Sequence, residues 1–259
     1  MTKPAFRLLE IEHLSKEFDL DGARIQALRD VNLFINKGEF ICLIGASGCG
    51  KSTLLRIVAG FETATSGSAK VRGKAVMEPG PDRGMVFQDY ALFPWLSVRD
   101  NIAFGPVERG VERAEIREKV EKFIDVVGLR KFAGAYPHQL SGGMKQRVAI
   151  ARVLANDADI VLMDEPFGAL DALTRERLQE ELLDIWQRTG LTVIFVTHSI
   201  EEAIFLADRV VVMTPGPGKI ESDNPIDLPR PRDVSSPEFN DLRRMLGAKL
   251  HSHHGRRAA

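Results

Sequence analysis

Eight consecutive residues, Gly45-Ala46-Ser47-Gly48-Cys49-Gly50-Lys51-Ser52, have the types and spacing of a phosphate-binding loop, G-x-x-x-x-G-K-S. Its glycines let the backbone turn tightly and direct successive N–H groups inward, towards an anion. Lys51 would reach the β- and γ-phosphates of a nucleotide, and the Ser52 hydroxyl would bind a magnesium ion held between them. The stretch therefore predicts a site for a nucleoside triphosphate and its metal.

A short apolar run precedes this loop and a helical pattern follows it. Residues 40–44 are continuous and apolar, as in a strand buried on both faces of a parallel sheet. From Thr53 onwards, apolar side chains recur at helical spacing until Gly60, which ends the helix. The positive end of this helix adds to the attraction for an anion. We expect Thr53, in its first turn, to contact the nucleotide as well.

Two later strands end in side chains suited to hydrolysis. The apolar run 160–163 leads to Asp164 and Glu165. After a phosphate loop, the first carboxylate is expected beside the metal, usually through water, and the second can act as the general base on the attacking water. The run 191–196 leads to His198, which could hydrogen-bond the γ-phosphate and orient the water. A histidine whose hydrogen bonds are satisfied within the core is the alternative.

A second helix start offers another anion site. Ser141, Gly142 and Gly143 precede an apolar helical run at 148–154. Taken alone, this tripeptide is typical of a plain capping turn. If both helix ends faced one nucleotide within a subunit, a single chain would be enough. If they lie far apart, two subunits must combine, so that the Ser141 end of one covers the γ-phosphate held by the other.

Composition excludes several classes of protein. The chain has 259 residues and a formal net charge of −1, so the overall charge gives no reason to expect nucleic acid or an anionic membrane as a partner. Its two cysteines, Cys42 and Cys49, cannot form a disulfide framework and suggest a reducing compartment. No apolar run approaches the roughly 18 residues that span a bilayer. We expect membrane contact only through a partner.

The pattern of elements predicts a single α/β domain with an insertion. Residues 1–89 and 141–230 are expected to form the core, with antiparallel strands ahead of the phosphate loop and a parallel sheet around it. Residues from about 90 to 140 are expected to be mainly helical, with Ser97 as a helix N-cap, and residues 231–259 to form a C-terminal helix and tail. Phe18 lies between the two opening strands, where its ring could stack on adenine or anchor the surface.

Taken together in chain order, these motifs resemble the ATP-binding cassette (ABC) family from near residue 7 to about residue 230. The resemblance is carried by the phosphate loop, Gln88, 140–146, 160–165, 169–171 and His198. It implies an ATPase with a P-loop fold, in which two copies sandwich two ATP molecules with Mg²⁺. By resemblance, Gln88 links the magnesium to the helical subdomain and contributes to catalysis, and Asp171 lines the subunit interface. Phe18 matches the adenine-stacking position.

Three further segments resemble the ATPase subunits of bacterial nitrate, sulfonate and taurine importers. They are residues 80–88, 92–102 and 213–220. This resemblance implies a homodimer on the cytoplasmic face of the bacterial inner membrane. Its partners would be an integral membrane permease and, indirectly, a periplasmic or lipid-anchored solute-binding protein.

Alternatives from other classes remain at this point. ABC ATPases of DNA repair or of ribosomes would be expected to carry a long coiled-coil insertion, a second cassette or a basic arm, which this sequence lacks. A non-catalytic ATP-binding regulator would be expected to lack Glu165 or His198, and both are present. The apolar residues Leu92, Phe93, Trp95 and Leu96 fit either a groove for a permease helix or the core of the helical insertion.

Overall fold

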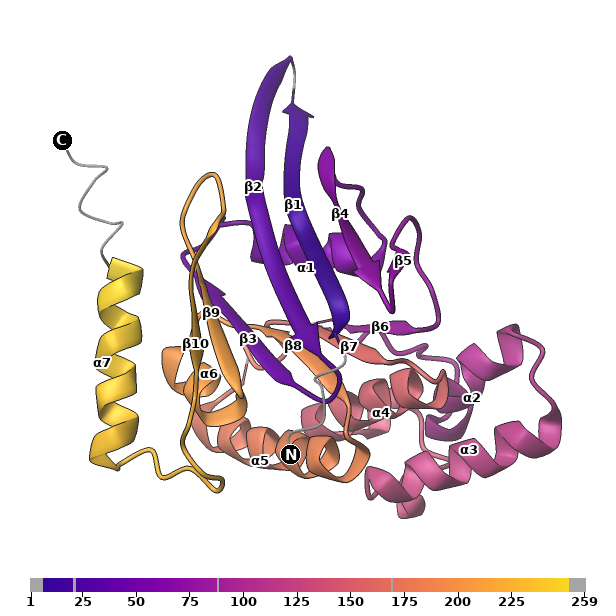
Figure 1. Ribbon diagram of the computed structural model, residues 1–259. Coiled ribbons are helices and arrows are strands. Elements are labelled where there is room, and N and C mark those ends of the chain that lie inside the picture. The colour runs from indigo at the N-terminus through magenta and orange to yellow at the C-terminus, as the bar shows by residue number, and fades with distance from the viewer. Residues whose placement is uncertain (1–6, 21, 88, 169, 252–259) are drawn as a thin grey trace, which may run out of the picture. The chain divides into compact units, whose positions relative to one another are not determined.

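The computed structural model describes residues 7–20, 22–87, 89–168 and 170–251 (Figure 1). The chain divides into two compact units. Unit 1 combines Met1–Pro79 with Thr192–Ala259, and unit 2 is the continuous segment Gly80–Leu191. The boundaries near residues 90 and 140 expected from the sequence remain a prediction. Among the described residues, no helix has the length and apolarity needed to cross a bilayer.

Unit 1 begins with an antiparallel sheet in the order β2-β1-β4-β5. Its strands are β1 (Arg7–Leu20), β2 (Ala23–Asn36), β4 (Ser66–Val71) and β5 (Lys74–Ala75). Figure 1 shows β1 and β2 as a long hairpin. On β1, Leu9, Ile11 and Leu14 are buried, as are Val31 and Leu33 on β2. This apolar face confirms the antiparallel strands expected ahead of the phosphate loop.

A parallel group of strands in unit 1 is built around β3 (Phe40–Gly45), which is buried throughout. It pairs in parallel with β8 (Thr192–Val196) on one side and with β9 (Arg209–Met213) on the other. Strand β10 (Ile220–Pro225) pairs with β9 in antiparallel. The helices of unit 1 are α1 (Lys51–Ala59), α6 (Ile200–Leu206) and α7 (Pro237–His251). Because the three parallel strands end in register, the loops that follow them leave the sheet at one edge.

Unit 2 contains the parallel pair β6 (Arg83–Val86) and β7 (Ile160–Asp164) and most of the helices. The helical elements are α2 (Val98–Glu108), α3 (Arg113–Val126), α4 (Gly142–Ala155), α5 (Ala172–Thr189) and two short 3₁₀ turns, η1 (Arg130–Phe132) and η2 (Pro137–Gln139). Helix α4 packs closely on β6, since a Cβ on Gly84 would lie 2.0 Å from Val153 Cγ1. The described residues between 90 and 140 are thus mainly helical, and the Ser97 hydroxyl caps α2 by accepting from the Asp100 N–H, as the sequence predicts.

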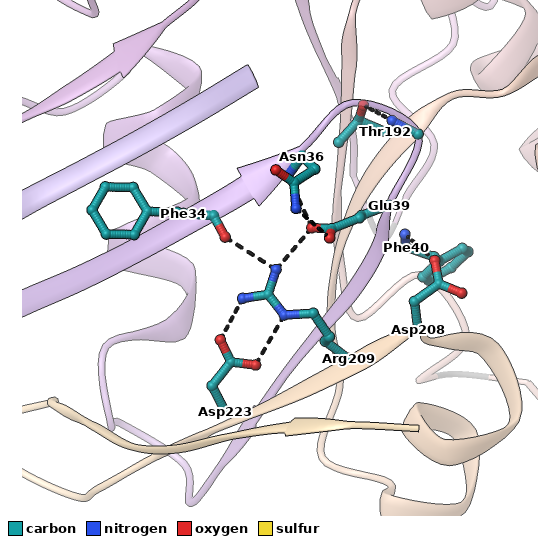
Figure 2. Close-up of polar contacts among 9 residues, drawn as sticks. Phe34, Asn36, Glu39, Phe40, Thr192, Asp208, Arg209 and Asp223 are labelled. Carbon is teal, nitrogen blue, oxygen red and sulfur yellow. Dashed lines mark hydrogen bonds and ion pairs between the residues drawn. The ribbon is translucent and has the colours of Figure 1, made fainter. Parts of the chain in front are cut away.

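A polar network fixes the start of β3 in unit 1 (Figure 2). The Arg209 guanidinium donates to Phe34 O at 3.1 Å and to Glu39 Oε2 at 2.8 Å, and its other edge donates to both carboxylate oxygens of Asp223. The bond to Asp223 is the main reason that the pKa of Arg209 is raised. Asn36 also donates to Glu39, at 2.7 Å. One side chain of β9 therefore joins β2, β10 and the residue that precedes β3.

Replacing Arg209 with Met is expected to lower the free energy of unfolding by about 1–3 kcal/mol, because two partly buried carboxylates lose their shared cation. Urea unfolding followed by circular dichroism measures the loss. The matched control is Arg244→Met, which removes an exposed pair with Asp241 and should cost about 0.5 kcal/mol or less. Equal losses in the two variants would show that the network does not hold β3.

Candidate nucleotide site

The phosphate loop in unit 1 connects β3 to α1 and has the shape of an anion cradle. Gly48 and Gly50 have φ values of 74° and 91°, which residues with a side chain rarely adopt. Gly50 is the N-cap of α1, and no side chain caps this helix. The N–H groups of the first turn are therefore left to an anion. The predicted end of the helix before Gly60 is confirmed, but the helix begins at Lys51, two residues before the predicted start at Thr53.

Lys51 is held inside this loop by backbone carbonyls. Its Nζ donates to Gly45 O at 2.8 Å and to Ala46 O at 3.1 Å, and the residue is only 6 % exposed. In contrast, Ser47, Gly48 and Ser52 are exposed to solvent, and Thr53 is half-buried. The loop thus places the Lys51 ammonium beneath residues that are open to solvent. This arrangement suits the binding of a polyphosphate chain.

His198 follows β8 at the edge where the phosphate loop leaves β3. Leu43 pairs with Val196, and the Thr197 N–H donates to Leu43 O at 3.2 Å. The imidazole is exposed, so the alternative of a core histidine is not what the structure shows. Ser199 caps α6 by accepting from the Glu202 N–H at 3.2 Å. Within unit 1, the structure therefore brings His198 and the phosphate loop to the same edge of the sheet.

Phe18 lies on β1, opposite Ile25 of β2. Its ring is half-buried, and the Lys16 ammonium lies 4.8 Å from the ring centroid. Lys16 itself is fixed by Glu62 Oε1 at 2.7 Å and by Thr63 O at 2.8 Å. One face of the ring is therefore held by a cation–π contact. A ring fixed in this way can serve as a platform for a base.

In unit 2, Asp164 ends β7 and Glu165 follows it with a φ of 47°. A left-handed backbone is uncommon for a residue with a long side chain and is associated with functional sites. The turn is closed by the Gly168 N–H, which donates to Glu165 O at 3.1 Å. Both carboxylates are half-buried. The sequence predicts their roles but not this backbone conformation.

Ser141 caps α4 as the sequence predicts, since its Oγ accepts from the Met144 N–H at 3.3 Å. The two glycines that follow differ in how closely they are packed. A Cβ on Gly143 would lie 2.5 Å from Leu178 Cδ2 of α5, so that side chain would have to shift, whereas one on Gly142 would lie 3.5 Å from the Tyr90 hydroxyl, an ordinary van der Waals contact. Because the two glycines have no side chains, an anion can approach the backbone N–H groups at this end of α4.

Asp171 is the N-cap of α5, where its Oδ1 accepts from the Thr174 N–H at 3.0 Å. That backbone hydrogen bond lowers the pKa of Asp171. Two other predicted positions, Gln88 and Ala169, lie outside the described residues. Asp171 is thus available as a fixed carboxylate at the start of a helix.

Arg152 of α4 is a residue that the sequence analysis missed. It donates to the backbone oxygens of Ala91 and Tyr90, at 2.7 and 3.2 Å, and burial lowers its pKa. Those two residues have left-handed φ values of 43° and 63°. A single arginine within the apolar run 148–154 was the only signal available in the sequence. It holds a strained turn that begins two residues after Gln88.

Each unit contains an oxygen donor of the kind that a magnesium ion prefers, Ser52 in unit 1 and Asp164 in unit 2. Mg²⁺ prefers oxygen ligands, keeps several waters and is commonly shared with substrate phosphates. The Ser52 hydroxyl and the Asp164 carboxylate offer oxygens of this kind. Among the described residues, no group of three or more His, Cys, Asp or Glu side chains could hold a metal without such help.

Comparison with known proteins gives a consistent result. A sequence profile described as ABC transporter matches residues 28–168. The nitrate import ATP-binding protein NrtD of Synechocystis sp. is 52% identical over 221 residues, which cover 85% of this chain and 83% of the relative. The taurine import ATP-binding protein TauB of Rhizobium johnstonii is 47% identical over 261 residues, covering 97% of this chain and all of the relative.

Solved structures with similar folds are ATP-binding cassettes. One is a dimeric cassette in a post-hydrolysis state bound to ADP and Pi, with a TM-score of 0.71, 31% identity and coverage of 85% of this chain and 100% of that chain. Another is cbiO1 from Clostridium perfringens, part of the complex cbiONQ, with a TM-score of 0.78, 28% identity and coverage of 97% of both chains. The predicted α/β P-loop fold is confirmed by these similarities.

Proposed function

The chain belongs to the ABC transporter family as an ATPase subunit, and we propose that it powers the import of a small solute such as nitrate, an alkanesulfonate or taurine. The names of relatives at 47% and 52% identity support an importer, and none of those compared above is named for DNA repair or for the ribosome. The observation that carries the proposal is the open phosphate loop around Lys51, combined with the capped Ser141-Gly142-Gly143 helix end.

In the proposed site, ATP binds to the residues from Gly45 to Thr53. The Lys51 ammonium exchanges its two carbonyl partners for phosphate oxygens, which its flexible stem allows. Phe18 stacks on the adenine. Asp164, Ser52 and Gln88 would hold Mg²⁺, which would supply positive charge to offset that of the phosphates.

Hydrolysis then requires one proton transfer and one orientation step. Glu165 accepts a proton from the attacking water as the general base. His198 donates a hydrogen bond to a γ-phosphate oxygen and thereby fixes the direction of attack. The strained backbone at Glu165 supports this role, because such strain persists only where the surrounding structure enforces it.

Two copies of the chain complete the site in this proposal. Ser141, Gly142 and Gly143 of one subunit cover the γ-phosphate bound to Lys51 of the other, and Asp171 lies at the interface. ATP therefore links the subunits, and its hydrolysis removes the link. The dimeric cassettes among the solved structures support this assembly.

A pocket in unit 2 is the proposed docking site for a cytoplasmic helix of the permease. The pocket has a volume of ≈ 470 Å³ and aromatic walls formed by Phe87, Phe93 and Phe104. Arg152 adds a positive charge to the lining of this pocket. Trp95 stands at 5.6 Å from the Phe93 ring and is 70 % exposed, so it is not a core residue. The apolar face of an amphipathic helix fits these aromatic walls.

Replacing Trp95 with Ala is expected to reduce solute uptake at least about tenfold, the loss of an aromatic hot spot at an interface. Basal ATP hydrolysis should stay within twofold of wild type, because the ring contact of Trp95 is with Phe93, which is not a predicted nucleotide residue. Uptake and hydrolysis are measured on the chain reconstituted with its permease in liposomes. Phe132→Ala, which removes another exposed aromatic of unit 2, is the control. Unchanged uptake in Trp95→Ala would place the docking site elsewhere.

The solute is tested by deleting the gene in the source organism. Uptake of labelled nitrate, taurine and an alkanesulfonate is then compared with wild type. We expect one of these uptakes to fall to background and to return with the wild-type gene but not with Lys51→Ala. Normal uptake of all three would contradict the proposed class of solute.

The proposed location of the chain is the cytoplasmic face of the inner membrane. A periplasmic or lipid-anchored protein is proposed to deliver the solute to the permease from the other side.

A further inference from the structure

The segment between β9 and β10, Thr214–Lys219, was singled out by its sequence but has no part in the mechanism above. We refer to it as the Gly218 loop. The Thr214 N–H donates to Lys219 O at 2.9 Å, and the Lys219 N–H donates to Thr214 Oγ1 at 3.2 Å. These two bonds close the loop on itself, so that it behaves as a compact unit.

The backbone of Gly218 is bonded to β2 on both sides. Its N–H donates to Ala27 O at 2.9 Å, and its oxygen accepts from the Arg29 N–H at 2.9 Å. Gly218 thus forms a one-residue parallel bridge opposite Leu28. The loop is attached to the β1–β2 hairpin at this residue.

The phosphate loop lies against the same point. A Cβ on Gly218 would be 2.0 Å from Cys49 O and 3.2 Å from Ala27 O. A Cβ on Gly50 would be 2.6 Å from Leu28 Cδ2 and 2.9 Å from Ala27 O. Since backbone oxygens cannot move aside as a side chain can, no residue other than glycine fits at position 218 without displacing the phosphate loop.

This contact determines which way one peptide of the cradle faces. In a trans peptide, C=O and N–H point in opposite directions. The Cys49 oxygen faces Gly218, so the Gly50 N–H faces away from it. Cys49 lies between two glycines in left-handed conformations, and glycine by itself imposes little preference on the backbone. The orientation therefore depends on neighbours: the Cys49 N–H donates to Ala46 O at 3.2 Å, and the Cys49 oxygen lies against Gly218.

The hairpin bonded to Gly218 also carries Phe18. Leu28, which packs beside Gly50, pairs with Lys16, and the Lys16 ammonium lies over the Phe18 ring. We propose that Gly218 is a positioning residue for the nucleotide, which holds the Cys49–Gly50 peptide and the Phe18 hairpin together in the binding arrangement. This inference rests on the proposed assignment of ATP to the phosphate loop.

The test compares nucleotide affinity with stability in Gly218→Ala, measured on the full chain with a fluorescent ATP analogue and by urea unfolding. We expect the dissociation constant to rise at least tenfold, even under conditions where the variant is fully folded. The matched control is Lys219→Ala, the exposed neighbour in the same loop, which should bind within twofold of wild type.

A second variant keeps the test decisive if Gly218→Ala does not fold. Thr214→Val removes the hydroxyl that closes the loop but leaves the backbone at Gly218 intact, and it should weaken binding about threefold. Wild-type affinity in both folded variants, or in Thr214→Val alone when only that variant folds, would overturn the inference. Lys51→Ala separates the two claims: if it also binds like wild type, the nucleotide site itself is misassigned and both claims fall.

Discussion

ATP hydrolysis by the Glu165→Gln variant is expected to fall by about 10²–10⁴-fold, while ATP binding remains within a few-fold of wild type. The amide keeps the size and much of the polarity of the carboxylate, but it cannot accept the proton of the attacking water. The bound ATP then persists between the subunits. A stable dimer should therefore appear in the variant on adding ATP with Mg²⁺, and only then.

Light scattering coupled to size-exclusion chromatography measures this assembly, and release of phosphate measures hydrolysis. Glu176→Gln is the matched control, since Glu176 is an exposed carboxylate of the same unit on α5. It should hydrolyse ATP like wild type and form no persistent dimer. If Glu165→Gln bound ATP but stayed monomeric, the two helix ends would not share a nucleotide without the permease.

Replacing Arg232 with Met is expected to lower the free energy of unfolding by about 3–5 kcal/mol, the range for breaking a buried charged network. Arg232 is 6 % exposed and donates to backbone oxygens only. Its partners are the oxygens of Ile204, Phe205, Ala207, Ile226 and Leu228. Burial lowers the pKa of Arg232 to about 10.

Three of those oxygens belong to the C-terminal end of α6, where a cation also opposes the negative end of the helix dipole. Methionine fills the space but leaves these oxygens without a donor. Urea unfolding measures the loss, with Arg243→Met as the control, because its ion pair with Glu201 is exposed and should contribute about 1 kcal/mol or less. A loss below about 1 kcal/mol in Arg232→Met would mean that water replaces the guanidinium.

Features with a local signal could be predicted from the sequence. The phosphate loop, the end of α1 at Gly60, and the caps at Ser97 and Ser141 all depend on residues within a few positions of one another, and the structure contains each of them. The parallel sheet could be predicted because its strands are buried on both faces and therefore read as continuous apolar runs.

Features that depend on distant contacts could not be predicted. The sequence predicts that Phe18 lies between the two opening strands, but it lies within β1, because the hairpin continues through this polar stretch, with Lys16 paired to Leu28 and Phe18 to Ile25. The left-handed backbone at Glu165 has no signal in its residue type. The packing of Gly218 on Cys49 has no such signal either, since Gly216 and Gly218 look equivalent in the sequence until the fold is known. The catalytic roles of the site residues remain predictions.

The order of the two units along the sequence has a consequence for synthesis of the chain on the ribosome. Unit 2 is one continuous segment, whereas the strands that pair with β3 in the described part of the chain are β8 and β9, which lie some 150 residues further along the sequence. Contacts between such distant segments form late, because a long loop must close first. All of unit 2 has therefore been synthesised before β3 gains a neighbouring strand. Until Gly218 emerges, the phosphate loop exists as a sequence without its final shape.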